Sequence, residues 1–354
     1  MVSYYHTLKV IASILSYKND PIQLKKLLSN PLFDWETLVK YASRHLVLPT
    51  IYTRLDQKSL LHVLPLDLKE YLNEITSINR NRNTSILNDV NNISNLFQTH
   101  HINHVFLKGT ALLAGAYYSD LGERMIGDID ILVDSKDMHT AYQLLLNANF
   151  EAAQESPLHQ YTDHKHLPRL IPKSGLAAVE IHRRLFNSKN TSLLMPNSIL
   201  ESKQLINKVF IPSNIHLLQH SVLNWQINDK GYYFSKIGFR SAFDSLTILN
   251  RHPEICVLDE INNKYSKNYF QLLSLFFDEI EPQIFKKNSL KLYYLKYKFE
   301  HTKLSHLIDY VLNKLSFLKV LFQRIYMFII NKEYRKAVLA DYNRIFKLLK
   351  ISKF

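Results

Sequence analysis

The sequence predicts an α+β protein in which a mixed unit of strands and helices lies between helical regions at either end of the chain. Apolar residues recur at helical spacing over most of its length, whereas short segments with strand-like alternation gather in residues 104–190. Glycine marks the same part, since four of the seven glycines fall within nineteen residues, between Gly109 and Gly127. Such a cluster indicates a backbone that turns tightly or approaches a ligand closely.

Composition places the chain among ordinary globular proteins. Its 354 residues exceed the usual length of one domain, and 46% apolar with 21% charged residues exclude disorder throughout and collagen-like repeats. The single cysteine, Cys256, cannot form an internal disulfide, and the opening residues lack the basic start and long apolar run of a secretion signal. We therefore expect a cytoplasmic protein.

The first hundred residues predict helices. Residues 20–28 predict a short helix, because Pro21 suits its first turn and the leucines share one face. Residues 34–55 predict two helices or one kinked helix, because Pro49 interrupts the pattern. Residues 66–100 predict a long helix with a polar face, broken or continuous.

Strands begin at residue 104. Residues 104–108 read as a short apolar strand that leads into a turn and a helix, and residues 127–134 alternate acids with Ile and Val as a strand does. Residues 136–147 predict a further helix. Two more strands follow, joined in a hairpin with Gly175 in its turn.

Beyond residue 190 the pattern is helical again. Residues 315–330 are strongly apolar, but Lys319 and Arg324 interrupt them and they fall short of a bilayer span, so they predict an interfacial or a core helix. We expect four parts along the chain. They are an N-terminal helical region (1–103), an α/β core (104–190), a helical domain that completes a cleft (191–280) and a basic amphipathic tail (281–354).

Positive charge is concentrated in the tail. Residues 281–354 hold 16 of the 44 Lys and Arg and only 5 of the 31 Asp and Glu, so they carry an excess of 11 out of the net charge of +13. A concentrated positive field attracts polyanions or anionic lipid. The tail is therefore a separate question from the chemistry of the core.

Asp128 and Asp130 carry the main chemical signal. Residues two apart on a strand project from the same side, so these carboxylates converge while Ile129, Ile131 and Val133 face the opposite, buried side. Two carboxylates this close repel each other unless a cation lies between them. Mg²⁺ suits this place, because it prefers carboxylate oxygens as ligands.

A third acid, Glu180, lies on a later predicted strand with His182 on the same side. If that strand neighbours the first, three acids surround one location, which is enough for a pair of metal ions that activate an attacking oxygen. His166 and His182 are expected across the hairpin from each other, in contact with nucleotide or acceptor. A zinc site with His164 is the disfavoured alternative, because no cysteine accompanies the histidines.

Lys108, Gly109 and Thr110 lie at the predicted strand-to-helix turn, where free backbone N–H groups and the helix dipole would hold a phosphate. Lys108 would add charge there, or else end a solvated strand. Arg124 would neutralise the same phosphates or form a structural salt bridge. Acids for metal and amides for phosphate together fit a metal-bound nucleoside triphosphate.

Arg240 and Asp244 stand four apart on one predicted helix. Side chains at this spacing are neighbours on a helix surface, so we expect an internal ion pair between them.

The segment LKGTALLAGAYYSDLGERMIGDIDILV, followed by VEIHRRL, resembles the uncharacterised nucleotidyltransferase family of the DNA polymerase β-like nucleotidyltransferase superfamily. The resemblance covers about residues 34–250, including FRSAFDSLTIL near its end. It implies a polymerase β-like nucleotidyltransferase core, with a small mixed sheet and helices, between N-terminal and C-terminal helical regions.

The resemblance also implies roles by position. Gly109 and Thr110 stand where the family binds the triphosphate, and Asp128 and Asp130 stand where it binds two metal ions, Mg²⁺ or Mn²⁺. Glu180 stands where a third acid holds the catalytic metal and helps to deprotonate the acceptor. Thr replaces the commoner Ser and Glu the commoner Asp, and neither change removes a ligand.

The leading hypothesis is a metal-dependent nucleotidyltransferase that moves a nucleoside monophosphate from a nucleoside triphosphate to an acceptor hydroxyl or phosphate and releases pyrophosphate. One alternative is a non-catalytic module that senses nucleotide or binds an anionic surface through its tail. Another is kinase-like phosphoryl transfer in the same pocket.

The acceptor stays open among a sugar, a lipid-linked molecule, a peptide and a protein. Nucleic acid is less favoured, because residues 1–280 carry almost no net charge to track a phosphate backbone. The basic tail would bind an anionic membrane surface, which would place a cytoplasmic protein at the inner face of the membrane.

Overall fold

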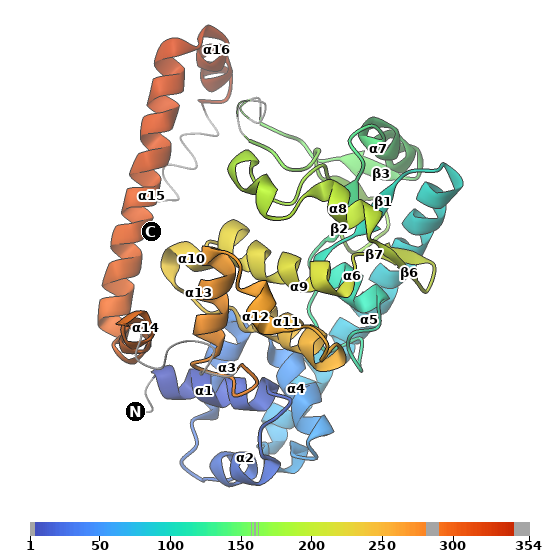
Figure 1. Cartoon of the computed structure of the whole chain (residues 1–354). Coiled ribbons are helices and arrows are strands. Elements are labelled where there is room, and N and C mark those ends of the chain that lie inside the picture. The colour runs from blue at the N-terminus through green and yellow to red at the C-terminus, as the bar shows by residue number, and fades with distance from the viewer. Residues whose placement is uncertain (1–3, 157, 159–160, 162, 281–289, 343–354) are drawn as a thin grey trace.

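The computed structural model describes residues 4–156, 158, 161, 163–280 and 290–342. Its N-terminal part is a set of packed helices, the longest of which, α5, extends from this set to the sheet (Figure 1). These elements are α1 (Tyr4–Leu15), α2 (Pro21–Leu28), α3 (Trp35–Arg44), α4 (Leu48–Gln57), a 3₁₀ turn (Leu61–Val63) and α5 (Leu66–Thr99).

A five-stranded mixed sheet follows, with the strand order β1-β2-β5-β4-β3. β2 and β5 are parallel, and the other neighbours are antiparallel. The strands and the helices between them are β1 (His104–Phe106), α6 (Lys108–Ala114), β2 (Ile129–Val133), α7 (Met138–Asn147), β3 (Phe150–Ala152), β4 (Leu170–Pro172) and β5 (Val179–His182). This arrangement is the predicted α+β class.

After the sheet the chain is mostly helical. Its elements are a 3₁₀ turn (Ser188–Leu193), α8 (Pro196–Glu201), β6 (Gln204–Ile206), β7 (Val209–Ile211), α9 (Asn214–Leu223), a π-helix (Asn224–Asn228), α10 (Gly231–Phe234), α11 (Phe239–Arg251), α12 (Val257–Glu260) and α13 (Lys264–Leu273). The tail adds α14 (Leu290–Glu300), α15 (Thr302–Ile330) and α16 (Lys332–Ala340). Tail residues 281–289 and 343–354 lie outside the described part of the chain.

Most of the predicted elements are confirmed. Pro49 lies in the first turn of α4, so residues 34–55 form two helices and not one kinked helix. Residues 66–99 form a single continuous helix. The two strands around Gly175 pair antiparallel, as the hairpin requires.

The β6–β7 hairpin corrects the prediction that the chain is helical beyond residue 190. Leu205 pairs with Phe210 across a two-residue turn at Asn207 and Lys208, whose φ angles are 48° and 67°. A turn with two positive φ angles matches the twist of antiparallel strands, and Asn adopts this conformation more readily than most residues. Short strand β3 is likewise absent from the prediction.

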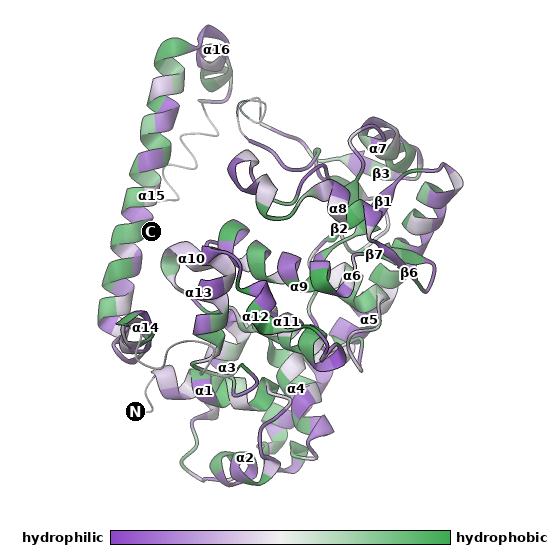
Figure 2. Cartoon of the chain, viewed as in Figure 1, coloured by the Kyte–Doolittle hydropathy of each residue, from purple (hydrophilic) through white to green (hydrophobic). Residues whose placement is uncertain are grey.

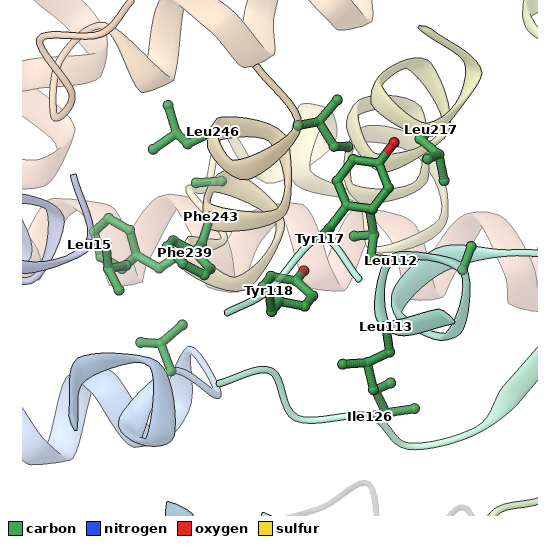
Figure 3. Close-up of a cluster of buried hydrophobic side chains, with 14 of the residues drawn as sticks. Leu15, Leu112, Leu113, Tyr117, Tyr118, Ile126, Leu217, Phe239, Phe243 and Leu246 are labelled. Carbon is green, nitrogen blue, oxygen red and sulfur yellow. The ribbon is translucent and has the colours of Figure 1, made fainter. Parts of the chain in front are cut away.

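One hydrophobic core joins helices from both ends of the chain. Figure 3 shows Leu15 of α1, Leu112 of α6, Leu217 of α9 and Phe243 of α11 in one cluster, with Tyr118 among them. These elements come from distant parts of the sequence. The core therefore packs N-terminal and C-terminal helices against Tyr118, which lies in the segment between α6 and β2. The predicted division into four parts stays a prediction.

The two faces of β2 contact different cores. Ile129, Ile131 and Val133 belong to the large core, as the alternation predicts, whereas Leu132 belongs to a second cluster. That cluster includes Phe186 and residues of α8. β2 is therefore covered on both faces, and Asp130 projects from the same side as Leu132.

α15 lies along one side of the molecule (Figure 1), and none of its residues is buried. Of the two alternatives for residues 315–330, the core helix is therefore wrong. Within the described ranges, no helix combines the length and apolar character needed to cross a membrane.

His104 of β1 is a buried histidine that the fold holds neutral. Its ring contacts the rings of Phe97, Phe106 and Phe210 edge to face, and its Nδ1 lies 2.8 Å from the Ile102 carbonyl oxygen. A carbonyl only accepts, so Nδ1 carries the proton. Burial lowers the pKa of His104 to about 4.

We predict that the protein loses stability as the pH falls from about 6.5 to about 5. Across this window the unfolded chain protonates His104 and the folded chain does not, so the free energy of unfolding falls by about 1.4 kcal/mol per pH unit for this residue. Urea unfolding across the window measures the slope. His104→Gln keeps an N–H donor for the Ile102 carbonyl but does not titrate. The variant should therefore lower the slope of unfolding free energy against pH by about 1.4 kcal/mol per pH unit, which corresponds to one proton. An unchanged slope would contradict the assignment.

Candidate active site

Asp130 and Glu180 lie opposite each other on neighbouring strands. The parallel register of β2 and β5 pairs Asp130 with Glu180 and Leu132 with His182. Side chains of directly paired residues project from the same face of a sheet. One ligand atom each from Asp130, Glu180 and His182 lie within 4.8 Å of one another, and all three residues are buried. The expected neighbourhood of the two strands is confirmed.

Asp130 has the lowest pKa of the three acids. Lys108 Nζ lies 2.5 Å from Asp130 Oδ1, and His182 Nε2 lies 2.8 Å from the same oxygen. Burial acts to raise the pKa of Asp130, but Lys108 and His182 outweigh it and hold the pKa well below its usual range. Asp130 therefore stays anionic although it is buried.

Arg169 links the other two acids. Its Nε donates to Glu180 Oε1 (3.0 Å), and its Nη2 lies 3.7 Å from Asp128 Oδ2. Burial acts to raise the pKa of Glu180, but His182 and Arg169 lower it to about 2. The sequence analysis missed Arg169. The β4–β5 register pairs Leu170 with Val179 and so places Arg169 across from Glu180. This register depends on the length of the hairpin loop, which the sequence pattern did not fix.

Asp130, Glu180 and His182 form a group that could hold a metal ion, and Asp128 lies beside this group. Burial, followed by the negative charges of Asp130 and Glu180, raises the pKa of Asp128, so this carboxylate would gain from a further cation. Within the described ranges, no hydrogen bond reaches either side-chain oxygen of Asp128 or the Oδ2 of Asp130. Free carboxylate oxygens are the ligands that Mg²⁺ and Mn²⁺ prefer.

A cleft of about 320 Å³ opens beside Asp128 and Asp130. Its walls come from the start of α6, from α9 and the π-helix, from the start of α11, and from the turn between α3 and α4. The lining residues are Arg44, His45, Leu46, Lys108, Gly109, Leu112, Arg124, Ile126, Gly127, Asp128, Asp130, Leu217, His220, Ser221, Asn224, Trp225, Asp229, Gly238, Arg240, Ser241 and Asp244.

Gly109 forms part of the cleft wall where α6 begins. Ala111 is the first residue whose N–H bonds back to a carbonyl at the start of α6, so the amides of Lys108, Gly109 and Thr110 have no partner within the helix. A Cβ atom on Gly109 would lie 2.9 Å from the guanidinium of Arg124. Glycine is therefore required for the close approach of these two groups.

Two side chains predicted to bind nucleotide do not line the cleft. Thr110 is buried, and its Oγ1 donates to the backbone carbonyl of Asp128 (3.3 Å), which helps to fix the start of β2. His182 is buried against Asp130, and its ring faces that of His166 across the hairpin with centroids 5.3 Å apart. The cross-hairpin pair is as predicted. Thr110 thus contacts the backbone of Asp128 and His182 the carboxylate of Asp130, and their nucleotide contact stays a prediction.

Arg124 forms a buried ion pair with Asp244, and this corrects the predicted pairing of Asp244 with Arg240. Arg124 Nε and Nη2 donate to the two carboxylate oxygens at 3.1 and 2.8 Å, and Tyr118 donates to Asp244 Oδ1 at 2.5 Å. Arg124 Nη1 donates to the Met125 carbonyl (2.5 Å). Of the two roles considered for Arg124, the structural salt bridge is formed, although the residue also lines the cleft.

Arg240 lines the cleft and interacts electrostatically with Asp244 and Asp229. It is half-buried, and no hydrogen bond or ion pair reaches it from the described residues. Burial, followed by the charge of Arg124, lowers the pKa of Arg240. The sequence analysis missed this group because helical spacing assigned it to Asp244.

α5 anchors the loop that leads into β2. Asn79 and Asn83, one turn apart on α5, both donate to the carbonyl of Arg124, at 3.1 and 2.7 Å. A Cβ atom on Gly122 would lie 2.7 Å from the Thr76 carbonyl oxygen, so the loop reaches α5 only because residue 122 is glycine. The polar face of the long helix is thus a buried support for the site.

A small mixed sheet with paired acids beside the start of a helix is the arrangement of a nucleotidyltransferase core. Residues 31–262 match the family described as "Uncharacterised nucleotidyltransferase", so the chain belongs to this family. The matched range contains the acids, Arg169 and every residue of the cleft wall. No curated protein matches the chain.

We predict unequal effects of Arg124→Gln and Arg240→Gln on stability. Arg124→Gln leaves Asp244 as a buried carboxylate without its cation, so the free energy of unfolding should fall by about 3 kcal/mol. Arg240→Gln removes an unpaired charge and should change it by less than about 0.5 kcal/mol. Urea unfolding of both variants measures the difference. A larger loss for Arg240→Gln would show that the ion pair is wrongly assigned.

Proposed function

We propose that this nucleotidyltransferase transfers a nucleoside monophosphate from a metal-bound nucleoside triphosphate to an acceptor hydroxyl or phosphate. The observation that carries the proposal is the meeting of Asp130 and Glu180 in one row of the sheet, with Asp128 beside them at the cleft. The amides at Gly109 lie on the same cleft wall and suit the phosphates.

Asp128 and Asp130 would hold the divalent cations, Mg²⁺ or Mn²⁺, through their free oxygens. Glu180 would be the third ligand through Oε2, since Arg169 occupies Oε1, and His182 Nε2, 3.4 Å from Oε2, would help to orient it. Two such ions would stabilise the attacking and leaving oxygens of the transfer. In the reaction, a hydroxyl acceptor would give its proton to Glu180 or to water, whereas a phosphate acceptor would attack as an anion. The acceptor oxygen bonds to the α-phosphorus, the bond from that phosphorus to the bridging oxygen breaks, and pyrophosphate leaves.

The cleft wall carries acids as well as cations, and with metal ions bound to the acids its positive side chains would favour an acceptor or substrate with negative charge. Lys108, Arg44 and Arg240 all line the cleft. Sugar, lipid-linked, peptide and protein acceptors remain the proposed classes, and nucleic acid is disfavoured because little net charge lies outside the tail. The single cysteine supports a cytoplasmic location, and the basic tail supports contact with the inner face of a membrane.

We predict that Asp128→Asn, Asp130→Asn and Glu180→Gln each lower the rate of pyrophosphate release by at least about 100-fold, because each removes a metal ligand. The assay combines the protein with Mg²⁺, each of the four nucleoside triphosphates and a panel of acceptors. Chelation of divalent cations should abolish release, and added Mg²⁺ or Mn²⁺ should restore it.

Asp134→Asn is the matched control. Asp134 directly follows β2, outside the cleft, and its carboxylate accepts the N–H of Lys136 (3.2 Å). It should keep the wild-type rate, and circular dichroism should show that all variants are folded. Full activity of Asp128→Asn or Asp130→Asn would overturn the proposal. A nucleoside diphosphate product would favour kinase-like transfer, and nucleotide binding without turnover would favour a sensing module.

We further propose that Arg240 binds the triphosphate. A half-buried cation that no side chain holds in a hydrogen bond or ion pair is costly to desolvate, and an anion in the cleft would supply those hydrogen bonds. A guanidinium also matches the paired oxygens of a phosphate.

We predict that Arg240→Gln weakens binding of a non-hydrolysable triphosphate by at least about 10-fold, with Arg240→Lys intermediate. Isothermal titration in the presence of Mg²⁺ measures the affinity. Arg251→Gln removes the same charge from the last turn of α11, outside the cleft, and should bind as the wild type does. Unchanged triphosphate affinity with a raised acceptor KM would assign Arg240 to the acceptor instead.

A further inference from the structure

α15 presents an apolar surface that the rest of the described chain leaves open. None of its residues is buried, and the exposed fraction reaches 66% at Phe322 and at Ile329. In Figure 2 hydrophobic colour recurs along the whole helix, which stands to one side of the globular body. Exposed apolar surface of this extent marks an interaction site.

The apolar residues form one continuous stripe. They recur at alternating intervals of four and three residues, which keeps them on one side of a helix over a length of about 40 Å. The stripe consists of Leu304, Ile308, Val311, Leu315, Leu318, Phe322, Ile325 and Ile329. Tyr326, which is 63% exposed, lies along its edge with a ring and a hydroxyl that suit a boundary between lipid and water.

Two lysines flank the stripe, one on each side. Lys314 directly precedes Leu315, and Lys319 directly follows Leu318. No acid occurs in residues 310–330, and Asp309, near the start of the stripe, is paired with Lys236 and Lys298, so the flanking charge beyond it is positive. Lysine stems can lie along an apolar surface while their ammonium groups reach a layer of phosphates.

This charge pattern selects lipid over a second copy of the chain. In a parallel pair of such helices in register, Lys314 of one copy would face Lys319 of the other, and an antiparallel pair centred on Lys314 or on Lys319 would place that lysine against its own copy. Like charges at these positions oppose association, whereas anionic headgroups complement them.

We propose that α15 binds the surface of an anionic phospholipid bilayer. The stripe enters the boundary between headgroups and acyl chains, and Lys314 and Lys319 contact lipid phosphates. The helix then lies in the plane of the surface and holds the catalytic body beside it. This proposal rests on α15 alone and is independent of the transfer reaction.

The test is co-sedimentation of the full chain with vesicles. Wild type should bind vesicles of phosphatidylglycerol and phosphatidylcholine, bind pure phosphatidylcholine much more weakly, and lose affinity in high salt. Lys314→Glu/Lys319→Glu should lower the affinity for the anionic vesicles by at least about 10-fold. Leu318→Gln/Phe322→Gln should lower it by a similar factor through the stripe.

Lys25→Glu/Lys26→Glu is the matched control, because it makes the same change in net charge on exposed residues of α2. It should bind vesicles within about twofold of wild type. If this control lost as much vesicle affinity as Lys314→Glu/Lys319→Glu, net charge alone would explain the effect and the proposal would be overturned. Failure of the wild type to bind anionic vesicles would also overturn it. If the wild type were instead a dimer that Leu318→Gln/Phe322→Gln converts to a monomer, the stripe would be a contact between two copies of the chain.

Discussion

The site depends on the neutralisation of acids that the sheet forces together. Asp130 and Glu180 occupy directly opposite positions on β2 and β5, where like charges destabilise a sheet. Lys108, His182 and Arg169 supply the compensating groups. Each comes from a different element: Lys108 begins α6 after β1, His182 ends β5, and Arg169 precedes β4. The strand order, with β5 between β2 and β4, therefore brings the acids together and also brings in the cations that offset their repulsion.

Local sequence patterns predicted the parts of this arrangement that are local. Alternation placed Asp128 and Asp130 on one side of β2 and Ile129 and Ile131 on the other, because side-chain direction along a strand follows directly from the pleat. The glycine cluster located the cleft wall, since close approach to Arg124 requires a residue without a Cβ at Gly109. Neither inference needed knowledge of distant contacts.

Pairings between distant segments were beyond these patterns. Arg169 reaches Glu180 only through the register of β4 and β5, which the hairpin loop sets. The support of the Arg124 carbonyl by Asn79 and Asn83 joins α5 to a loop some forty residues later, and nothing local distinguishes those asparagines from solvated ones. Polar residues on a helix face predict solvent exposure unless the partner that buries them is known.

Asp244 shows how a local rule fails when a stronger partner is available. An ion pair four residues apart on a helix stabilises by only a few tenths of a kcal/mol. Arg124 instead offers two parallel hydrogen bonds in a buried setting where Tyr118 also donates, and a buried carboxylate needs such satisfaction far more than an exposed one. Because Asp244 is taken by Arg124, Arg240 lies on the cleft wall without a hydrogen bond or ion pair from the described residues. The pairing that stabilises the fold thus leaves a cation available for an anionic substrate.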